Sequence, residues 1–60
     1  MKYSEFHRLI QKNGWKFLKA TGSHYFYEKE GRSSPPVPYL GSKEMPEGLR
    51  KKVMRDIGLK

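Results

Sequence analysis

The length of the chain is the tightest constraint on its fold. Sixty residues without a cysteine leave room for one hydrophobic core and provide no disulfide. A chain of this size buries only roughly 60% of the surface that its unfolded form exposes, so its stability must come from packing or from a partner. We therefore expect a single domain over residues 1–60.

An amphipathic helix is predicted near the start of the chain. Its apolar side chains recur at the 3.6-residue period: Tyr3, Phe6, Leu9 and Ile10. Ser4 is the expected N-cap, and Asn13-Gly14 is the expected end. His7 falls at the flank of the apolar arc, so we expect it at the surface or at its boundary.

Three short strands are predicted next, over residues 15–20, 24–29 and 33–38. The third contains Pro35, Pro36 and Pro38, which cannot donate ladder hydrogen bonds, so it must be a brief or irregular edge strand. A last helix follows Pro46 and ends at Gly58. This order predicts an α+β fold, α-β-β-β-α, with a three-stranded antiparallel sheet and two helices on one face.

Consecutive aromatic residues, Tyr25 to Tyr27, place rings on both faces of the central strand. If the helices cover one face, at least one ring is exposed on the other. Such a ring beside cations can stack a base of single-stranded RNA or anchor a protein partner. Aromatic residues also suit strands in general, so strand preference alone explains the pattern equally well.

The charge of the chain indicates a polyanionic partner. Thirteen Lys and Arg residues against six Asp and Glu residues give a formal net charge of +7. The cations are spread over several elements, including Lys51 on the last helix, which favours nucleic acid over a membrane surface. No apolar run is long enough for a membrane span or a signal peptide, and a cysteine-free chain suits the cytoplasm. A basic surface that serves solubility alone is the plainer alternative.

The chemistry of the chain centres on Gly22-Ser23-His24. No carboxylate pair, metal-ligand cluster, phosphate loop or serine elbow is present, so we expect neither metal nor cofactor. Gly22 can take a positive φ and lets backbone N–H groups approach a phosphate, while Ser23 adds a hydroxyl donor. An imidazole gains and loses a proton near neutral pH, which suits His24 to proton transfer.

RNA is a substrate that such a minimal site can cleave, because its 2′-hydroxyl supplies the nucleophile. Positive charge around the phosphate is then the remaining requirement. The candidates for this role are Lys16, Lys19 and Lys43. The plainer interpretation of His24 is a turn histidine that is hydrogen-bonded to local backbone.

The chain resembles the HicA toxins of bacterial HicA-HicB toxin-antitoxin pairs over nearly its whole length. The resemblance rests on short motifs in the same order and at the same spacing: Ser4-Glu5-Phe6, Asn13-Gly14-Trp15, Gly22-Ser23-His24, Val37-Pro38, Lys43-Glu44-Met45 and Ile57-Gly58-Leu59. Where many members have a histidine two residues after the Val-Pro pair, this chain has Leu40, so a second proton-transfer residue is not found there.

The resemblance implies a fold similar to the double-stranded-RNA-binding domain and metal-independent cleavage of mRNA that arrests translation. It implies that Gly22 and His24 form the active-site motif, and that a HicB antitoxin covers the His24 region. The residues alone leave two alternatives, a non-catalytic RNA-binding module and a protein-binding adaptor. Loss of RNA cleavage in His24→Ala with retention of the fold would separate the nuclease from both.

Overall fold

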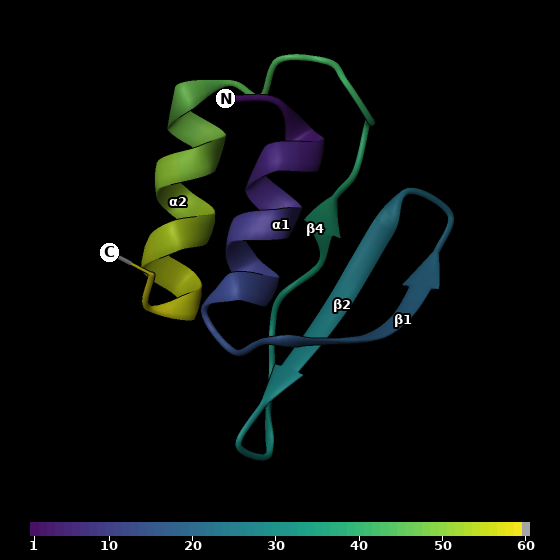
Figure 1. The fold of residues 1–60 in the computed structure, drawn as a ribbon, viewed down its shortest axis with the longest axis vertical. Coiled ribbons are helices and arrows are strands. Elements are labelled where there is room, and N and C mark those ends of the chain that lie inside the picture. Colours follow the sequence, from purple (N-terminus) through teal and green to yellow (C-terminus); the bar gives the residue numbers. More distant parts are fainter. Residues whose placement is uncertain (60) are drawn as a thin grey trace.

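The computed structural model describes residues 1–59 and has the predicted order of helices and strands (Figure 1). The elements are α1 (Tyr3–Lys12), β1 (Lys16–Thr21), β2 (His24–Lys29), β3 (Arg32–Ser33), β4 (Val37–Pro38) and α2 (Glu47–Ile57). The α+β prediction is therefore confirmed, with the third predicted strand divided into two short pieces.

The central strand β2 organises the sheet. It pairs antiparallel with β1 on one side and with both β3 and β4 on the other. Between β3 and β4 the chain leaves the ladder, because Pro35 and Pro36 have no N–H to donate. Ser34 connects this segment to β2, since its N–H donates to the Tyr27 carbonyl (2.8 Å) and its Oγ accepts from the Tyr27 N–H (2.9 Å).

The two helices lie side by side and run in the same direction (Figure 1). The prediction that Ser4 caps α1 is wrong, because the helix begins at Tyr3 with Lys2 as its N-cap residue. The loop before α2 supplies the acceptors instead, since the N–H of Tyr3 donates to the Lys43 carbonyl and that of Ser4 to the Gly41 carbonyl. A side-chain cap is thus not needed at these positions.

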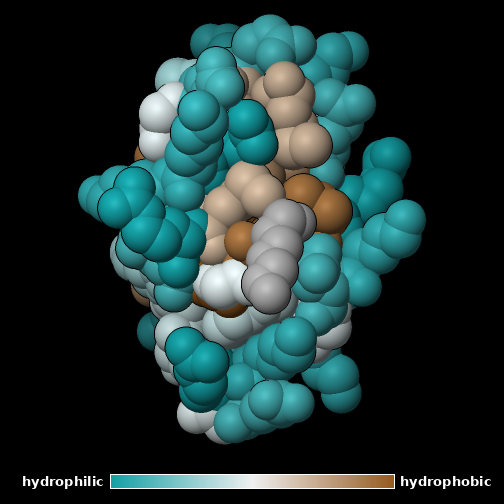
Figure 2. Space-filling model, turned by 90° about the vertical axis from the view of Figure 1, so that its left-hand side faces the viewer, coloured by the Kyte–Doolittle hydropathy of each residue, from teal (hydrophilic) through white to brown (hydrophobic). Residues whose placement is uncertain are grey.

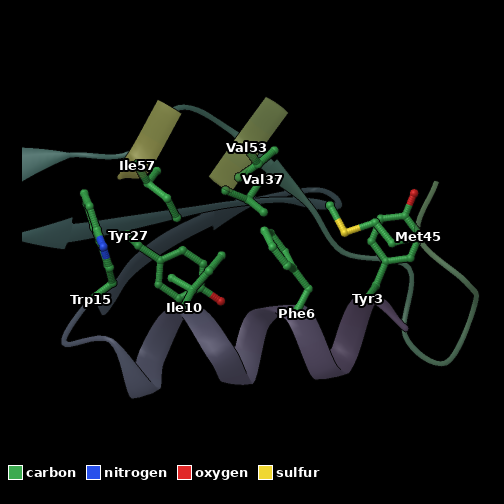
Figure 3. Packing of buried hydrophobic residues seen from close by; sticks show 9 residues of the cluster. All are labelled: Tyr3, Phe6, Ile10, Trp15, Tyr27, Val37, Met45, Val53 and Ile57. Carbon is green, nitrogen blue, oxygen red and sulfur yellow. The ribbon is translucent and has the colours of Figure 1, made fainter. Parts of the chain in front are cut away.

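Nine buried apolar side chains form the core, and they come from both helices, from the sheet and from the connecting segments. They are Tyr3, Phe6, Ile10, Trp15, Tyr27, Val37, Met45, Val53 and Ile57. Figure 3 shows the side chains of α1 and α2 pointing into the same interior, with Tyr27 and Val37 of the sheet beside them. The core therefore covers one face of the sheet and fixes which residues of β2 face away from it.

The ends of α2 and its outer surface follow the sequence pattern. Gly58 has a φ of +75° and caps the helix in the left-handed conformation, as predicted. The side of the molecule that carries α2 is largely hydrophilic around a small apolar area (Figure 2).

Within residues 1–59 we find no helix with the length and apolar character that crossing a membrane requires.

Candidate functional site

The β1–β2 hairpin places His24 at a fixed position. Thr21 pairs with His24, so Gly22 and Ser23 form a two-residue turn. Gly22 has a φ of +61°, which only glycine adopts easily at the first central position of such a turn. The Tyr39 N–H donates to the Ser23 carbonyl (2.8 Å) and thereby anchors the turn on the segment after β4.

His24 is exposed on the face of the sheet that the helices leave open. Side chains alternate along a strand, and Tyr27 of β2 points into the core, so His24 and Phe26 point the other way. The imidazole of His24 makes no hydrogen bond within residues 1–59. The alternative of a turn histidine bonded to local backbone is therefore wrong for the described part of the chain.

A bulge in β1 brings a second predicted cation, Lys19, onto this same face. Phe17 pairs with Tyr27, but Lys19 pairs with Phe26, so one extra residue is inserted at Leu18. Without the bulge, Lys19 would point to the same side as Phe17, towards the helices. With it, Lys19 joins Lys16, which pairs with Glu28, on the face of His24.

Lys19 makes a specific contact there. Its Nζ lies 5.3 Å from the centroid of the Phe26 ring, which is within cation–π range. Tyr25 and Tyr27 belong to the side of the helices, so Phe26 is the β2 aromatic that faces away from them. It is partly exposed, and its position on the open face is the one that the alternating pattern predicts.

The other two predicted cations lie elsewhere. Lys43 belongs to the loop before α2, where its carbonyl accepts the Tyr3 N–H. Lys51 lies on α2, and its Nζ is 3.3 Å from a carboxylate oxygen of Glu47. Figure 1 places α2 on the opposite side of the molecule from the β1–β2 hairpin. The structure therefore groups Ser23 and Lys19 with His24, places Lys16 on the same face at the far end of the hairpin, and separates Lys51 from them.

His7 is buried, so the prediction that it lies at the surface or at its boundary is wrong. Its side chain is held by two hydrogen bonds, from the Tyr27 hydroxyl to Nδ1 (2.6 Å) and from Nε2–H to the Pro38 carbonyl (2.8 Å). Burial lowers the pKa of His7 below 6.5, and the Pro38 hydrogen bond opposes this only in part. Burial also raises the pKa of Tyr27 to about 12, so its phenol stays protonated and donates.

Sequence reasoning missed His7 because the partners are distant along the chain. Burying an imidazole requires acceptors and donors for both nitrogens, and these come from β2 and β4. The sequence indicated the burial of His7 only indirectly, through the tyrosines of β2, whose hydroxyl groups can form hydrogen bonds with a buried polar side chain.

The site is a surface rather than a cleft. A hollow of about 560 Å³ lies at the far end of the hairpin, and His24 is not among its lining residues, which are Gly14, Lys16, Glu28, Lys29, Glu30 and Gly31. Over residues 1–59, no three His, Asp or Glu side chains are grouped so that they could hold a metal ion. The chemistry that this surface itself offers is an imidazole, two ammonium groups and a glycine turn.

Comparison with known proteins identifies the family of the chain. The family model described as the HicA toxin of bacterial toxin-antitoxin matches residues 3–59. The chain is also similar to a protein of Pseudomonas fluorescens (strain Pf0-1) named probable mRNA interferase HicA, with 45% identity over 60 residues. That alignment covers 100% of this chain and 98% of the relative. The chain therefore belongs to the HicA family of bacterial toxins.

Proposed function

We propose that the chain is a metal-independent endoribonuclease that cleaves mRNA and thereby arrests translation, with His24 as the proton-transfer group. The observation that carries the proposal is the exposed imidazole of His24 on an open face that also presents Lys16 and Lys19. The relative from Pseudomonas fluorescens, which is named probable mRNA interferase HicA, supports the same activity.

The reaction uses the RNA as its own nucleophile. The 2′-oxygen attacks the adjacent phosphorus, His24 accepts the 2′-hydroxyl proton, and the bond from phosphorus to the 5′-oxygen breaks. The products are a 2′,3′-cyclic phosphate and a 5′-hydroxyl, which takes its proton from water or from the imidazolium. Proton transfer by a positioned side chain typically contributes on the order of 10²–10⁴ in rate.

The groups around His24 suit the charge that develops on the phosphate. Lys19 supplies positive charge near His24, Lys16 lies further along the same face, and the Ser23 hydroxyl and the Gly22 turn can donate hydrogen bonds. Glycine at position 22 keeps the turn free of a side chain where the phosphate approaches. Lys43 and Lys51 are proposed to contact RNA beyond the cleaved bond, since phosphate contacts position a nucleic acid without reading its sequence.

The test is cleavage of an end-labelled mRNA by the wild-type protein and by His24→Ala, with EDTA present. We expect cleavage by the wild type and none by His24→Ala, and a deoxynucleotide at the cleaved position should block the wild type. Thr21→Ala is the matched control, because Thr21 is the exposed cross-strand neighbour of His24 and has no proton-transfer group. RNA binding without cleavage by the wild type would instead identify a non-catalytic RNA-binding module.

The partner proposed for the active face is a HicB-type antitoxin, with the cytoplasm as the place of action. The basic open face predicts that the antitoxin covers the His24 region with acidic or carbonyl groups. Addition of a cognate HicB-type antitoxin should therefore abolish cleavage and shift the His24 imidazole resonances in an NMR spectrum. Inhibition that leaves these resonances unchanged would place the antitoxin elsewhere.

A further inference from the structure

We propose that the Phe26 ring is a base-stacking subsite, which takes the nucleobase next to the phosphate that His24 acts on. This inference rests on the proposed function, and it adds to it the residue that holds the substrate base. Its basis is the juxtaposition of His24, Phe26 and Lys19 on one open face of the sheet.

The position of Phe26 fits a nucleotide that is bound at His24. The two residues are separated by one position on β2, so their side chains lie on the same face about 7 Å apart along the strand. A base stacked on Phe26 would thus belong to a nucleotide next to the reacting phosphate. No helix covers this face, because α1 and α2 pack with the core residues on the other side.

Lys19 provides the second half of the subsite. Its ammonium group lies over the Phe26 ring, at 5.3 Å from the centroid. A base that stacks on the ring displaces the ammonium group, which then binds the phosphate of the same nucleotide. Stacking and charge neutralisation are the two interactions that single-stranded RNA sites combine.

The charge distribution favours RNA over a protein segment as the occupant. Across this face Glu28 is the only acidic residue of β1 and β2, and it pairs with Lys16 at the end remote from His24. The end with His24 therefore carries no acidic side chain of β1 or β2, while Lys19 and Phe26 give it positive charge and an aromatic surface. A polyanion with flat apolar bases matches both properties at once.

The first measurement tests stacking without cleavage. An RNA that carries 2-aminopurine at successive positions is titrated with His24→Ala protein, and the fluorescence should be quenched at one position beside the cleavage site. A Phe26→Leu change in that protein should remove the quenching. Phe17→Leu is the matched control, because Phe17 lies on the same hairpin, is 50% exposed, and belongs to the opposite face. Unchanged quenching in the Phe26→Leu protein would overturn the proposal.

The second measurement uses the active protein. Some contacts are equally strong in the bound substrate and in the transition state. Removing such a stacking contact raises KM and leaves kcat unchanged. We expect Phe26→Leu to raise KM roughly 10-fold and Phe26→Trp to restore it, since one stacked base commonly contributes that much to binding. An unchanged KM with normal folding by circular dichroism would contradict the subsite. Cleavage by His24→Ala would refute the proposed function, whereas the fluorescence result tests Phe26 independently of cleavage.

Discussion

The Nδ1 atom of His7 lies 2.6 Å from the hydroxyl oxygen of Tyr27, and the two residues are only 5% and 1% exposed. The opposite nitrogen of the ring donates to the Pro38 carbonyl, so one imidazole ties α1 to both β2 and β4. Pro38 is also the cross-strand partner of His24. The buried His7 therefore stabilises the pairing of β2 with β4, and this strand pair carries the exposed His24.

Stability should fall on acidification because of His7. Burial lowers its folded-state pKa below 6.5, so between that lowered value and 6.5 the unfolded chain binds more protons than the folded one. The stabilisation is present above about pH 6.5, the usual pKa of unfolded histidine, and is lost as the pH falls towards the folded pKa. Urea unfolding at pH 7.5, 6.5 and 5.5 should show a steeper decline for the wild type than for His7→Gln.

The control for this pH dependence is His24→Gln. This change removes an exposed imidazole and should keep the wild-type decline. All three proteins carry the same carboxylates, so the differences between proteins isolate His7. Parallel curves for the wild type and His7→Gln would mean that His7 does not carry the effect.

Tyr27→Phe should destabilise the fold by about 1–3 kcal/mol. The change deletes the hydroxyl that donates to His7 and leaves a buried nitrogen without its partner. Tyr25→Phe is the matched change on the same strand, because the Tyr25 hydroxyl makes no hydrogen bond within residues 1–59 and its loss should cost less than about 0.5 kcal/mol. Equal midpoints for the two variants in urea unfolding would argue against a structural role for the His7–Tyr27 bond.

Phe6→Ala should cost roughly 3–5 kcal/mol, because it empties a fully buried aromatic site at the centre of the core. A domain of 60 residues has a total stability of only about 3–9 kcal/mol, so this variant should be largely unfolded or melt far below the wild type. Phe17→Ala removes a ring that is 50% exposed and should melt close to the wild type. Thermal melts followed by circular dichroism compare the two directly.

The parts of the fold that depend on local pattern were predictable from the sequence. The apolar period of α1, the glycine at the end of α2 and the proline-broken edge strand all act within a few neighbouring residues. The same holds for the turn before His24, because a positive φ at Gly22 is a local requirement. These features led to the correct element order and to an exposed His24.

The features that depend on distant parts of the chain were not predictable. The bulge at Leu18 is a property of the register between β1 and β2, and no residue type in β1 predicts it. It decides that Lys19 lies on the same face as His24, which residue spacing alone could not establish. The burial of His7 likewise depends on a hydroxyl and a carbonyl that lie 20 and 31 residues further along the chain.

Gly22→Ala should weaken both the hairpin and the activity. A Cβ at this position would meet no atom within 4 Å, so the cost comes from the positive φ, which disfavours alanine by about 1–2 kcal/mol. Relief of that strain would shift Ser23 and His24 relative to each other, so RNA cleavage should fall along with the melting temperature.

The matched change is Gly48→Ala in α2. Gly48 has helical backbone and open space for a Cβ, so the same substitution should stabilise the protein by roughly 0.5–1 kcal/mol and leave cleavage unchanged. A synthetic chain with D-alanine at position 22 accepts the positive φ, and it should recover both stability and cleavage. If that chain were stable but inactive, the role of Gly22 would be the absence of a side chain where the phosphate approaches, rather than the conformation of the turn.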